Sequence, residues 1–405
     1  MPRPLLRLLG ASLALVALAT PVAAQTTGEP PAEQPRLFLG PIGLTPTLTI
    51  KDIGVDTNVF RTAGSPERDF TATVGPGVNA VLRLGRANIR VDSRLDWIYF
   101  QKFDHQRSFN LSETGRVDVD LVRLTPFVRG NYTRTRQRPN PELDIRVQQK
   151  LTGAGGGVGM RVGPGFLIEA AGDVSRVELD DDDPELAQLA EALNRRTERA
   201  TLAGRWRLTP LTSVVVRGEA GRDEFELSPL RDSRSFSLMP GIELRPLALV
   251  SGHAFVGVKR FVTDEAALPD YTGVVADVAV GWMVRDLTHF KVGVRRDVEY
   301  SFEALEPYFL LTDVQVEVRQ ALGYQWDVVG RTGLAQLAYR RLDDAGAAAA
   351  AGRRDWAVLM GMGVGRRLGD YVRVGIDVDR VARRSPLADR EYEGFRIGGS
   401  FTYGY

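Results

Sequence analysis

Apolar and charged residues alternate along most of this chain, and residues 88–100 show the pattern most clearly. The odd positions of this segment are largely apolar and its even positions largely charged: Ile89, Val91, Leu95 and Trp97 against Arg90, Asp92, Arg94 and Asp96. Because alternate side chains of a strand point to opposite faces, the segment predicts a strand with one apolar and one charged face. The same pattern recurs in residues 115–121, 198–208, 212–223, 312–319 and 372–379.

Strands of this kind, repeated without a helix between them, are typical of a transmembrane barrel with an apolar outside and a wet inside. Long polar loops, such as 179–196 and 340–354, alternate with short turns near residues 85, 122, 164, 209, 245, 285, 323 and 369. Outer-membrane barrels have short periplasmic turns and longer external loops, so this alternation also orients the chain. We predict an all-β fold, a transmembrane antiparallel up-and-down β-barrel of about 18 strands, within a range of roughly 16 to 20.

Residues 1–24 have the features of a secretory signal peptide. Arg3 and Arg7 supply a positive start, residues 13–19 an apolar middle, and small residues precede an expected cleavage site near Ala24. An apolar run of this length is too short for a membrane-spanning helix. We therefore expect cleavage and export.

Two further regions follow the predicted signal peptide. Residues 25–40 are rich in Pro, Thr and Gly and predict a flexible periplasmic leader. Residues 41–405 carry the alternating strands and form the predicted outer-membrane β-barrel. The expected location is therefore the bacterial outer membrane, as an integral protein.

Composition excludes several other classes of function. The chain has no cysteine, which rules out a disulfide framework and thiolate metal sites. Its net charge is only +1 and it lacks a basic stripe, so a nucleic-acid partner is not expected. His105, His253 and His289 are scattered, and although Ser251 shares a strand face with His253, nothing else in the sequence marks the pair as catalytic. We expect no enzymatic activity, no cofactor and no bound metal.

The C-terminal segment alternates aromatic with small or polar residues and ends on Tyr405, after Phe401 and Tyr403. A final alternating strand that closes on an aromatic residue looks like the signal read by the outer-membrane assembly machinery. That machinery is therefore an expected partner, together with outer-membrane lipid and lipopolysaccharide.

The charged parity of the strands predicts the lining of the pore. The predicted pore-lining residues are Arg90, Asp92, Arg94, Asp96, Arg116, Asp118, Arg205, Arg207, Arg217, Glu219, Lys291, Arg295, Asp313, Glu317, Arg319, Arg373, Asp377 and Arg396. Both signs are present, so this lining predicts weak ion selectivity, whereas a ring of one sign would select. A barrel of this size leaves an aqueous channel, and a mixed lining suits a hydroxyl-rich solute such as a glycan.

Glu113 breaks the alternation, because it shares its parity with the apolar residues Phe109 and Leu111. Two explanations are open. A β-bulge near Glu113 or Gly115 would turn the carboxylate inward, or the residue would lie above the membrane.

The segments Thr45–Thr49, Val55–Phe60 and Asp69–Val78 resemble the opening of a β-barrel porin family associated with exopolysaccharide biosynthesis and export. Members of that family often have paired acidic residues before the Asn of the first strand, where this chain has Asp56 and Thr57. The resemblance implies a conduit or accessory barrel for a secreted polysaccharide, with the polysaccharide and periplasmic export components as partners.

The main functional hypothesis from the sequence is thus a passive outer-membrane pore that serves exopolysaccharide export. Two alternatives stay open. The barrel could be a general porin for small solutes, or a closed structural or adhesive barrel at the cell surface, as its charged external loops suggest.

Overall fold

The computed structural model describes residues 35–404, apart from 139, 143, 181–190, 246–248, 267, 324, 342–351 and 370. The strands of this part are β1 (Leu37–Leu39), β2 (Ile42–Asp56), β3 (Asp69–Leu84), β4 (Ala87–Phe100), β5 (Ser108–Val119), β6 (Leu124–Gln137), β7 (Val147–Gly163), β8 (Phe166–Asp180), β9 (Arg195–Arg207), β10 (Thr212–Phe225), β11 (Ser233–Leu244), β12 (Val250–Thr263), β13 (Tyr271–Val284), β14 (Thr288–Tyr300), β15 (Tyr308–Leu322), β16 (Trp326–Arg340), β17 (Arg354–Leu368), β18 (Val372–Arg384) and β19 (Tyr392–Tyr403). Three short 3-10 helices, η1 (Asp104–Gln106), η2 (Pro229–Arg231) and η3 (Ala388–Arg390), lie in loops between them. Within these residues, no α-helix is long and apolar enough to span a membrane.

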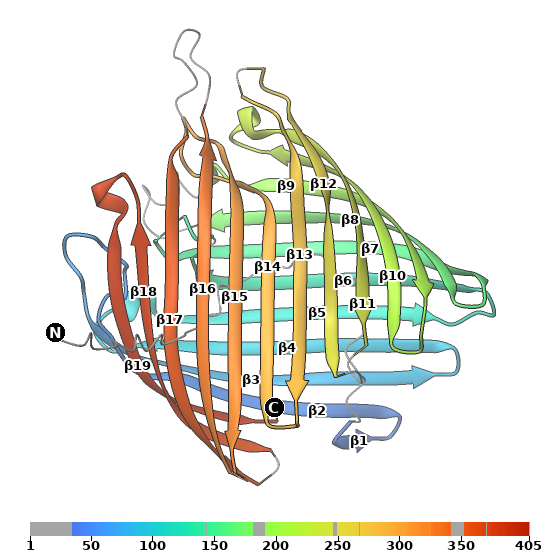
Figure 1. Cartoon of the computed structure of the whole chain (residues 1–405), viewed down its shortest axis with the longest axis horizontal. Coiled ribbons are helices and arrows are strands. Elements are labelled where there is room, and N and C mark those ends of the chain that lie inside the picture. Colours follow the sequence, from blue (N-terminus) through green and yellow to red (C-terminus); the bar gives the residue numbers. More distant parts are fainter. Residues whose placement is uncertain are drawn as a thin grey trace, which may run out of the picture.

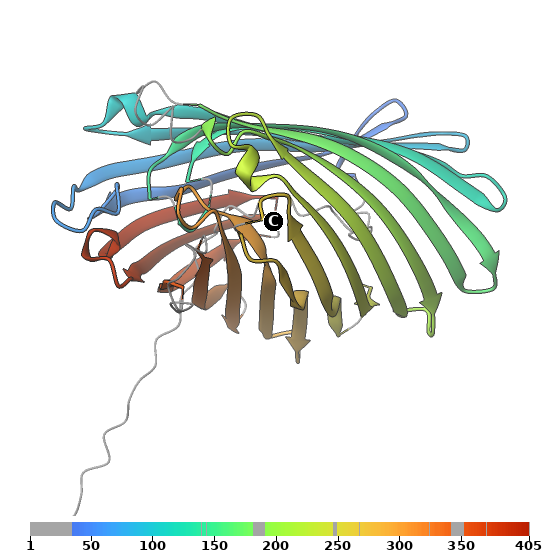
Figure 2. The same cartoon turned by 90° about the horizontal axis from the view of Figure 1, so that it is seen from above.

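Strands β2 to β19 form one closed antiparallel barrel. Each strand pairs with its neighbours along the chain, and β19 pairs back with β2, which gives 18 barrel strands as the alternation predicts. The first and last strands, blue and red, accordingly lie side by side (Figures 1 and 2). In Figure 1, the strands of the near wall cross those of the far wall steeply, as tilted strands of a barrel do.

The predicted strand bounds agree with the structure to differing degrees. The strand predicted from residues 88–100 lies within β4, Ala87–Phe100. The first barrel strand begins at Ile42, one residue inside the predicted barrel region 41–405. Residues 37–39, which belong to the predicted flexible leader, form β1 and pair with β2. The predicted signal peptide and most of the leader lie outside the described residues.

Strand register separates an apolar outer face from a polar inner face. Directly paired residues of neighbouring strands share a face, so Leu202 of β9 lies with Ala170 of β8 and Gly218 of β10. Leu202 is 60% exposed, and Ile376 of β18 is 65% exposed with an apolar neighbour, Val364, across the ladder. A monomer in water would bury such side chains, whereas lipid solvates them.

The upper part of the β14–β15 hairpin leaves the wall and bends into the lumen. β13 and β14 pair only from Ala276 and Arg296 towards their shared turn, although β14 continues to Tyr300 in its pairing with β15. Above that point Tyr300 packs against Phe261, an inner-face residue of β12, with the ring centroids 6.1 Å apart. The upper ends of β13 and β14 diverge accordingly (Figure 1).

The two faces of β9 can be tested with neighbouring substitutions. Leu202→Arg places a cation against hydrocarbon and should destabilise the barrel by about 2–4 kcal/mol. Thr201→Arg adds the same side chain to the inner face, opposite Glu219, and should cost less than about 1 kcal/mol. Urea unfolding in lipid vesicles measures both. Equal costs would contradict the assignment of the faces.

Candidate pore lumen

All of the predicted pore-lining residues occupy inner-face positions in this register. They lie on β4 (Arg90, Asp92, Arg94, Asp96), β5 (Arg116, Asp118), β9 (Arg205, Arg207), β10 (Arg217, Glu219), β14 (Lys291, Arg295), β15 (Asp313, Glu317, Arg319), β18 (Arg373, Asp377) and β19 (Arg396). Their contribution to conduction stays a prediction. Phe401 and Tyr403 of the predicted assembly signal lie on the outer face of β19, and Tyr405 is outside the described residues.

Most of these lumen charges form ion pairs. Arg205 contacts Glu243 of β11 at 2.8 Å, and Arg217 lies 3.4 Å from Asp277 of β13. The other pairs are Arg90 and Arg116 with Asp118, Arg94 with Asp96, Lys291 with Glu317, Arg295 with Glu299, Arg331 with Asp377, Arg373 with Asp327, and Arg396 with Asp52 and Asp379. Pairing of this kind neutralises much of the wall and leaves little net field from it.

Glycine tracks on the inner face allow some of these pairs to span two strands. Arg373 of β18 reaches Asp327 of β16 at 2.6 Å, across Gly365 of the intervening strand β17. A Cβ atom at Gly365 would overlap the Arg373 guanidinium. The same arrangement places Arg129 of β6 2.5 Å from Asp173 of β8, over Gly155 of β7. Long side chains can therefore lie flat on the wall instead of filling the bore.

The extracellular half of the lumen holds two inward segments, which we call the mouth plug. One is the hairpin tip 301–307 between β14 and β15, and the other comprises the described residues of loop 138–146 between β6 and β7. Phe302 of the tip packs in an apolar cluster with Val147, Val177, Leu179, Leu193 and Phe225. These partners belong to the wall around β7 to β10, so the tip reaches across the lumen from its own strands.

Hydrogen bonds join the two segments of the mouth plug. The carboxylate of Glu142 accepts hydrogen bonds from Ser301 Oγ at 2.6 Å and from the backbone N–H of Phe302 at 3.0 Å. The Asn140 side-chain amide donates to the Tyr300 carbonyl at 3.3 Å. Arg231 of η2 holds the tip from the other side, donating to the carbonyls of Ser301 and Phe302.

Arg383 of β18 fixes loop 138–146 to the opposite wall. Its guanidinium contacts Asp355 of β17 at 2.6 Å and Asp144 at 3.0 Å, and donates to the Glu142 carbonyl at 2.6 Å. Arg383 is only 1% exposed, so its buried charge depends on these two carboxylates. Arg138 extends the same loop towards residues 57–62 by donating to the Val59 carbonyl at 2.7 Å. Hydrogen bonds and ion pairs therefore hold the mouth plug on several sides.

Burial changes the acid–base behaviour of the mouth plug. Desolvation raises the pKa of Glu142 to about 7, although the bonds from Ser301 and Phe302 and the nearby Arg353 guanidinium favour its charged form. The negative charge of Glu303 raises it further. Desolvation, with repulsion from Arg61, lowers the pKa of Arg138 to about 9. Glu142 thus changes charge near neutral pH, at the contact between the two segments.

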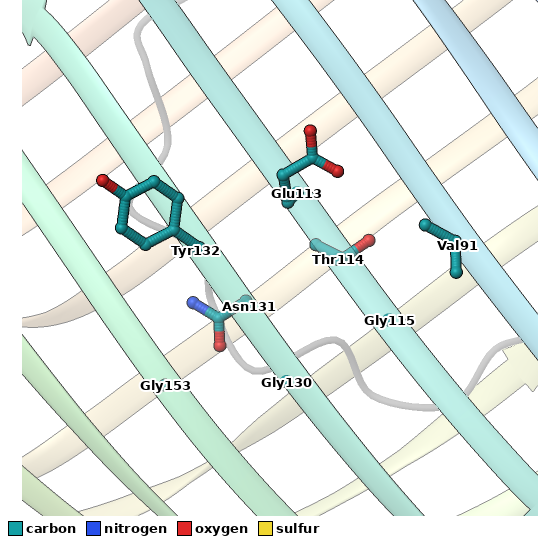
Figure 3. Close-up of a pocket in the computed structure, with 8 residues that line it drawn as sticks. All are labelled: Val91, Glu113, Thr114, Gly115, Gly130, Asn131, Tyr132 and Gly153. Atoms are coloured by element: carbon teal, nitrogen blue, oxygen red, sulfur yellow. The ribbon is translucent and has the colours of Figure 1, made fainter.

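Glu113 occupies the outer face without a β-bulge. Its pairing with Ser93 of β4 and Tyr132 of β6 continues the regular ladders, so the predicted bulge is wrong. Ser93 Oγ donates to the Glu113 carboxylate at 2.6 Å. A shallow notch of about 340 Å³ lies beside it, where Gly115 and Gly130 carry no side chain (Figure 3). Five residues separate Glu113 from the upper end of β5, which places it within the wall rather than above it.

Sequence reasoning missed the mouth plug. Loop 138–146 contains Arg138, Asn140 and Glu142 among prolines, which is typical of any polar external loop. Tyr300 has the parity of a lipid-facing position in β14. The only available signal was the combination of apolar Phe302 with charged residues in a supposedly solvated loop, which indicates that one side of the loop is buried.

The family comparison agrees with this architecture. The model of the putative beta-barrel porin 2 family matches residues 39–402. The chain belongs to this family. Family and barrel together identify a porin-like outer-membrane barrel, a channel rather than an enzyme. No curated protein matches the chain.

Solved structures of outer-membrane porins have a similar fold. The Pseudomonas aeruginosa OccK2 (OpdF) structure in complex with glucuronate has a TM-score of 0.51 and 12% identity, covering 89% of this chain and 98% of that chain. The OpdK structure from the same organism has a TM-score of 0.48, 13% identity and coverages of 89% and 99%. At such identities the likeness concerns the fold alone.

The glycine track of β17 generates a prediction. Gly363→Val would place side-chain atoms where Asp377 now lies and should separate Asp377 from Arg331, with a cost of about 1–3 kcal/mol. Gly333→Val on β16 is the control, because a Cβ there meets only Leu359, at 3.5 Å, which is ordinary contact. Unfolding in vesicles compares the two. The explanation fails if both variants lose the same stability.

The raised pKa of Glu142 predicts that opening of the mouth plug depends on pH. Its pKa is about 7 in the plug, against 4.5 for a free side chain, so the closed contact binds a proton that the released loop gives up. Lowering the pH from 7 towards 5 should therefore favour closure, and raising it should favour opening, by at most about tenfold per pH unit for one proton. Single-channel open probability between pH 5 and 8 measures this. Glu142→Gln, which keeps a neutral acceptor, should remove the dependence; an unchanged pH profile in that variant would contradict it.

Proposed function

We propose that this barrel is a passive diffusion porin for small polar solutes. The observation that supports this best is the mouth plug, in which buried contacts of Glu142, Arg231 and Arg383 hold two segments across the lumen. A bore that is wide in the wall but restricted by folded loops limits passage by solute size.

The same observation weighs against the conduit for exopolysaccharide that the family resemblance implies. A polymer threading through the bore would have to displace Phe302 from its apolar cluster and separate Asp144 of the loop from Arg383. A small solute needs only the space around the plug or its brief opening. The paired, solvated charges of the lumen wall support the passage of water and polar solutes. The described residues form no folded plug domain of the kind that fills the lumen of an energy-coupled transporter.

A deletion strain separates the two transport hypotheses. Loss of the gene should slow the uptake of small polar solutes and leave the amount of secreted polysaccharide unchanged. If secretion fell while uptake stayed constant, the conduit would be the better description.

The mouth plug can be loosened at one residue to test the size limit. Arg231→Gln removes donors to the carbonyls of Ser301, Phe302 and Glu303, so the tip should detach more often. Single-channel conductance and the largest sugar admitted into proteoliposomes should both rise. Arg234→Gln, three residues away in an exposed pair with Asp264, is the control and should change neither. Absence of any steady current from both the native chain and Arg231→Gln would instead support a closed surface barrel.

A further inference from the structure

Five inner-face arginines near the periplasmic ends of their strands have no ion pair with a carboxylate of the described residues. They are Arg83 of β3, Arg161 of β7, Arg207 of β9, Arg319 of β15 and Arg367 of β17. Each stands within a few residues of a short turn, so together they surround the periplasmic end of the lumen. They contrast with neighbouring arginines that have carboxylate partners, such as Arg205 and Arg373.

Like charges and unpaired donors distinguish this region from ordinary wall. Arg367 lies directly opposite Arg373 in the β17–β18 ladder. Positively charged residues directly opposite each other destabilise a sheet. The Nε atoms of Arg319 and Arg367 are buried without a hydrogen-bond partner in the described part of the chain. Arg319 and Arg367 therefore have fewer of their polar groups satisfied than the ion-paired arginines of the wall.

The carboxylates near these five arginines are too few to neutralise them, because most already have another partner. Three of them are already engaged: Glu243 with Arg205 at 2.8 Å, Asp327 with Arg373 at 2.6 Å, and Glu317 with Lys291 at 3.5 Å.

Three other carboxylates of this end remain among the described residues: Asp286 of the β13–β14 turn, beside Arg285, and two that have neighbours of their own. Glu169 interacts electrostatically with Arg129, and Asp120 accepts a hydrogen bond from Asn88 at 2.9 Å. Even with all three counted against the five arginines, positive charge remains in excess.

We propose that these five arginines make the periplasmic end of the pore an anion filter, which passes small anionic solutes such as carboxylates in preference to cations. The inference rests on the proposed porin function and names its substrate class. Paired charges cancel within a few ångströms, so the selectivity of this end follows from its unpaired remainder, in which arginines outnumber carboxylates. A guanidinium also offers two parallel donors to a carboxylate, which favours organic acids over simple halides. The mixed lining alone predicts weak selectivity, and the pairing pattern revises that expectation.

Reversal potentials in planar bilayers test the filter. We expect the native barrel, under a tenfold KCl gradient near 0.1 M, to prefer chloride, since the Debye length there is about 10 Å. The triple variant R207Q/R319Q/R367Q should lose at least about half of the preference. The matched control R196Q/R222Q/R234Q removes three arginines that lie on the outer face, where Arg196 and Arg222 pair with Glu198 and Glu224, and should behave as the native chain. Arg207→Gln alone, a milder change, should give a smaller shift in the same direction.

The outcomes separate the filter from the pore itself. A steady current with no preference for chloride, or a preference that the triple variant and Arg207→Gln both leave intact, overturns the anion filter and leaves the porin function standing. A folded native barrel that carries no current, even as the Arg231→Gln variant, overturns the proposed function and the filter with it. An outer-face control that shifts as far as the triple variant also overturns the filter, because the effect would then be non-specific.

Discussion

Closure of the backbone hydrogen bonds is the constraint on which this structure depends. In hydrocarbon, each unpaired N–H or C=O costs several kcal/mol, so a sheet can span the membrane only if it has no open edge. The pairing of β19 with β2 removes that edge, at the expense of register shifts near Gly399 and between Lys51 and Gly54. Asp52 takes a positive φ of 59° there, and its carboxylate contacts Arg396 of β19 at 2.8 Å. An ion pair on the wet side thus stabilises the seam.

The features that could be predicted from sequence are those that the solvent imposes on each strand separately. Lipid outside and water inside fix the parity of β4 and β18, so their lengths and faces follow from alternation alone. The mouth plug follows a different rule. Tyr300 has outward parity, yet it faces the inner residues of β12 because β14 leaves its pairing with β13 after Arg296. A departure from the wall depends on contacts between distant strands, which periodicity does not encode.

Glu113 shows where alternation misleads even within the wall. Both explanations open at the sequence level assume that a carboxylate avoids lipid, but the ladders to Ser93 and Tyr132 are regular. The neighbouring outer positions, Gly115 and Gly130, are small and leave the carboxylate beside a notch rather than packed into a continuous apolar surface. The hydrogen bond from Ser93 satisfies one oxygen. Local geometry therefore reduces a cost that residue type alone would overstate.

The lumen charges fall into two groups, those in ion pairs and those without, and the proposed selectivity depends on this difference. Pairs laid over glycine tracks, such as Arg373 with Asp327, make a strong contact in the wall and contribute little field to a passing ion. Removing either member would expose the other, so such pairs are kept for structure. Arg207 and Arg319 contribute no comparable contact, and their charge acts on the water of the bore. In the proposed anion filter, the count of charges of each sign therefore does not set the selectivity. Selectivity follows from the charges that the protein leaves unpaired.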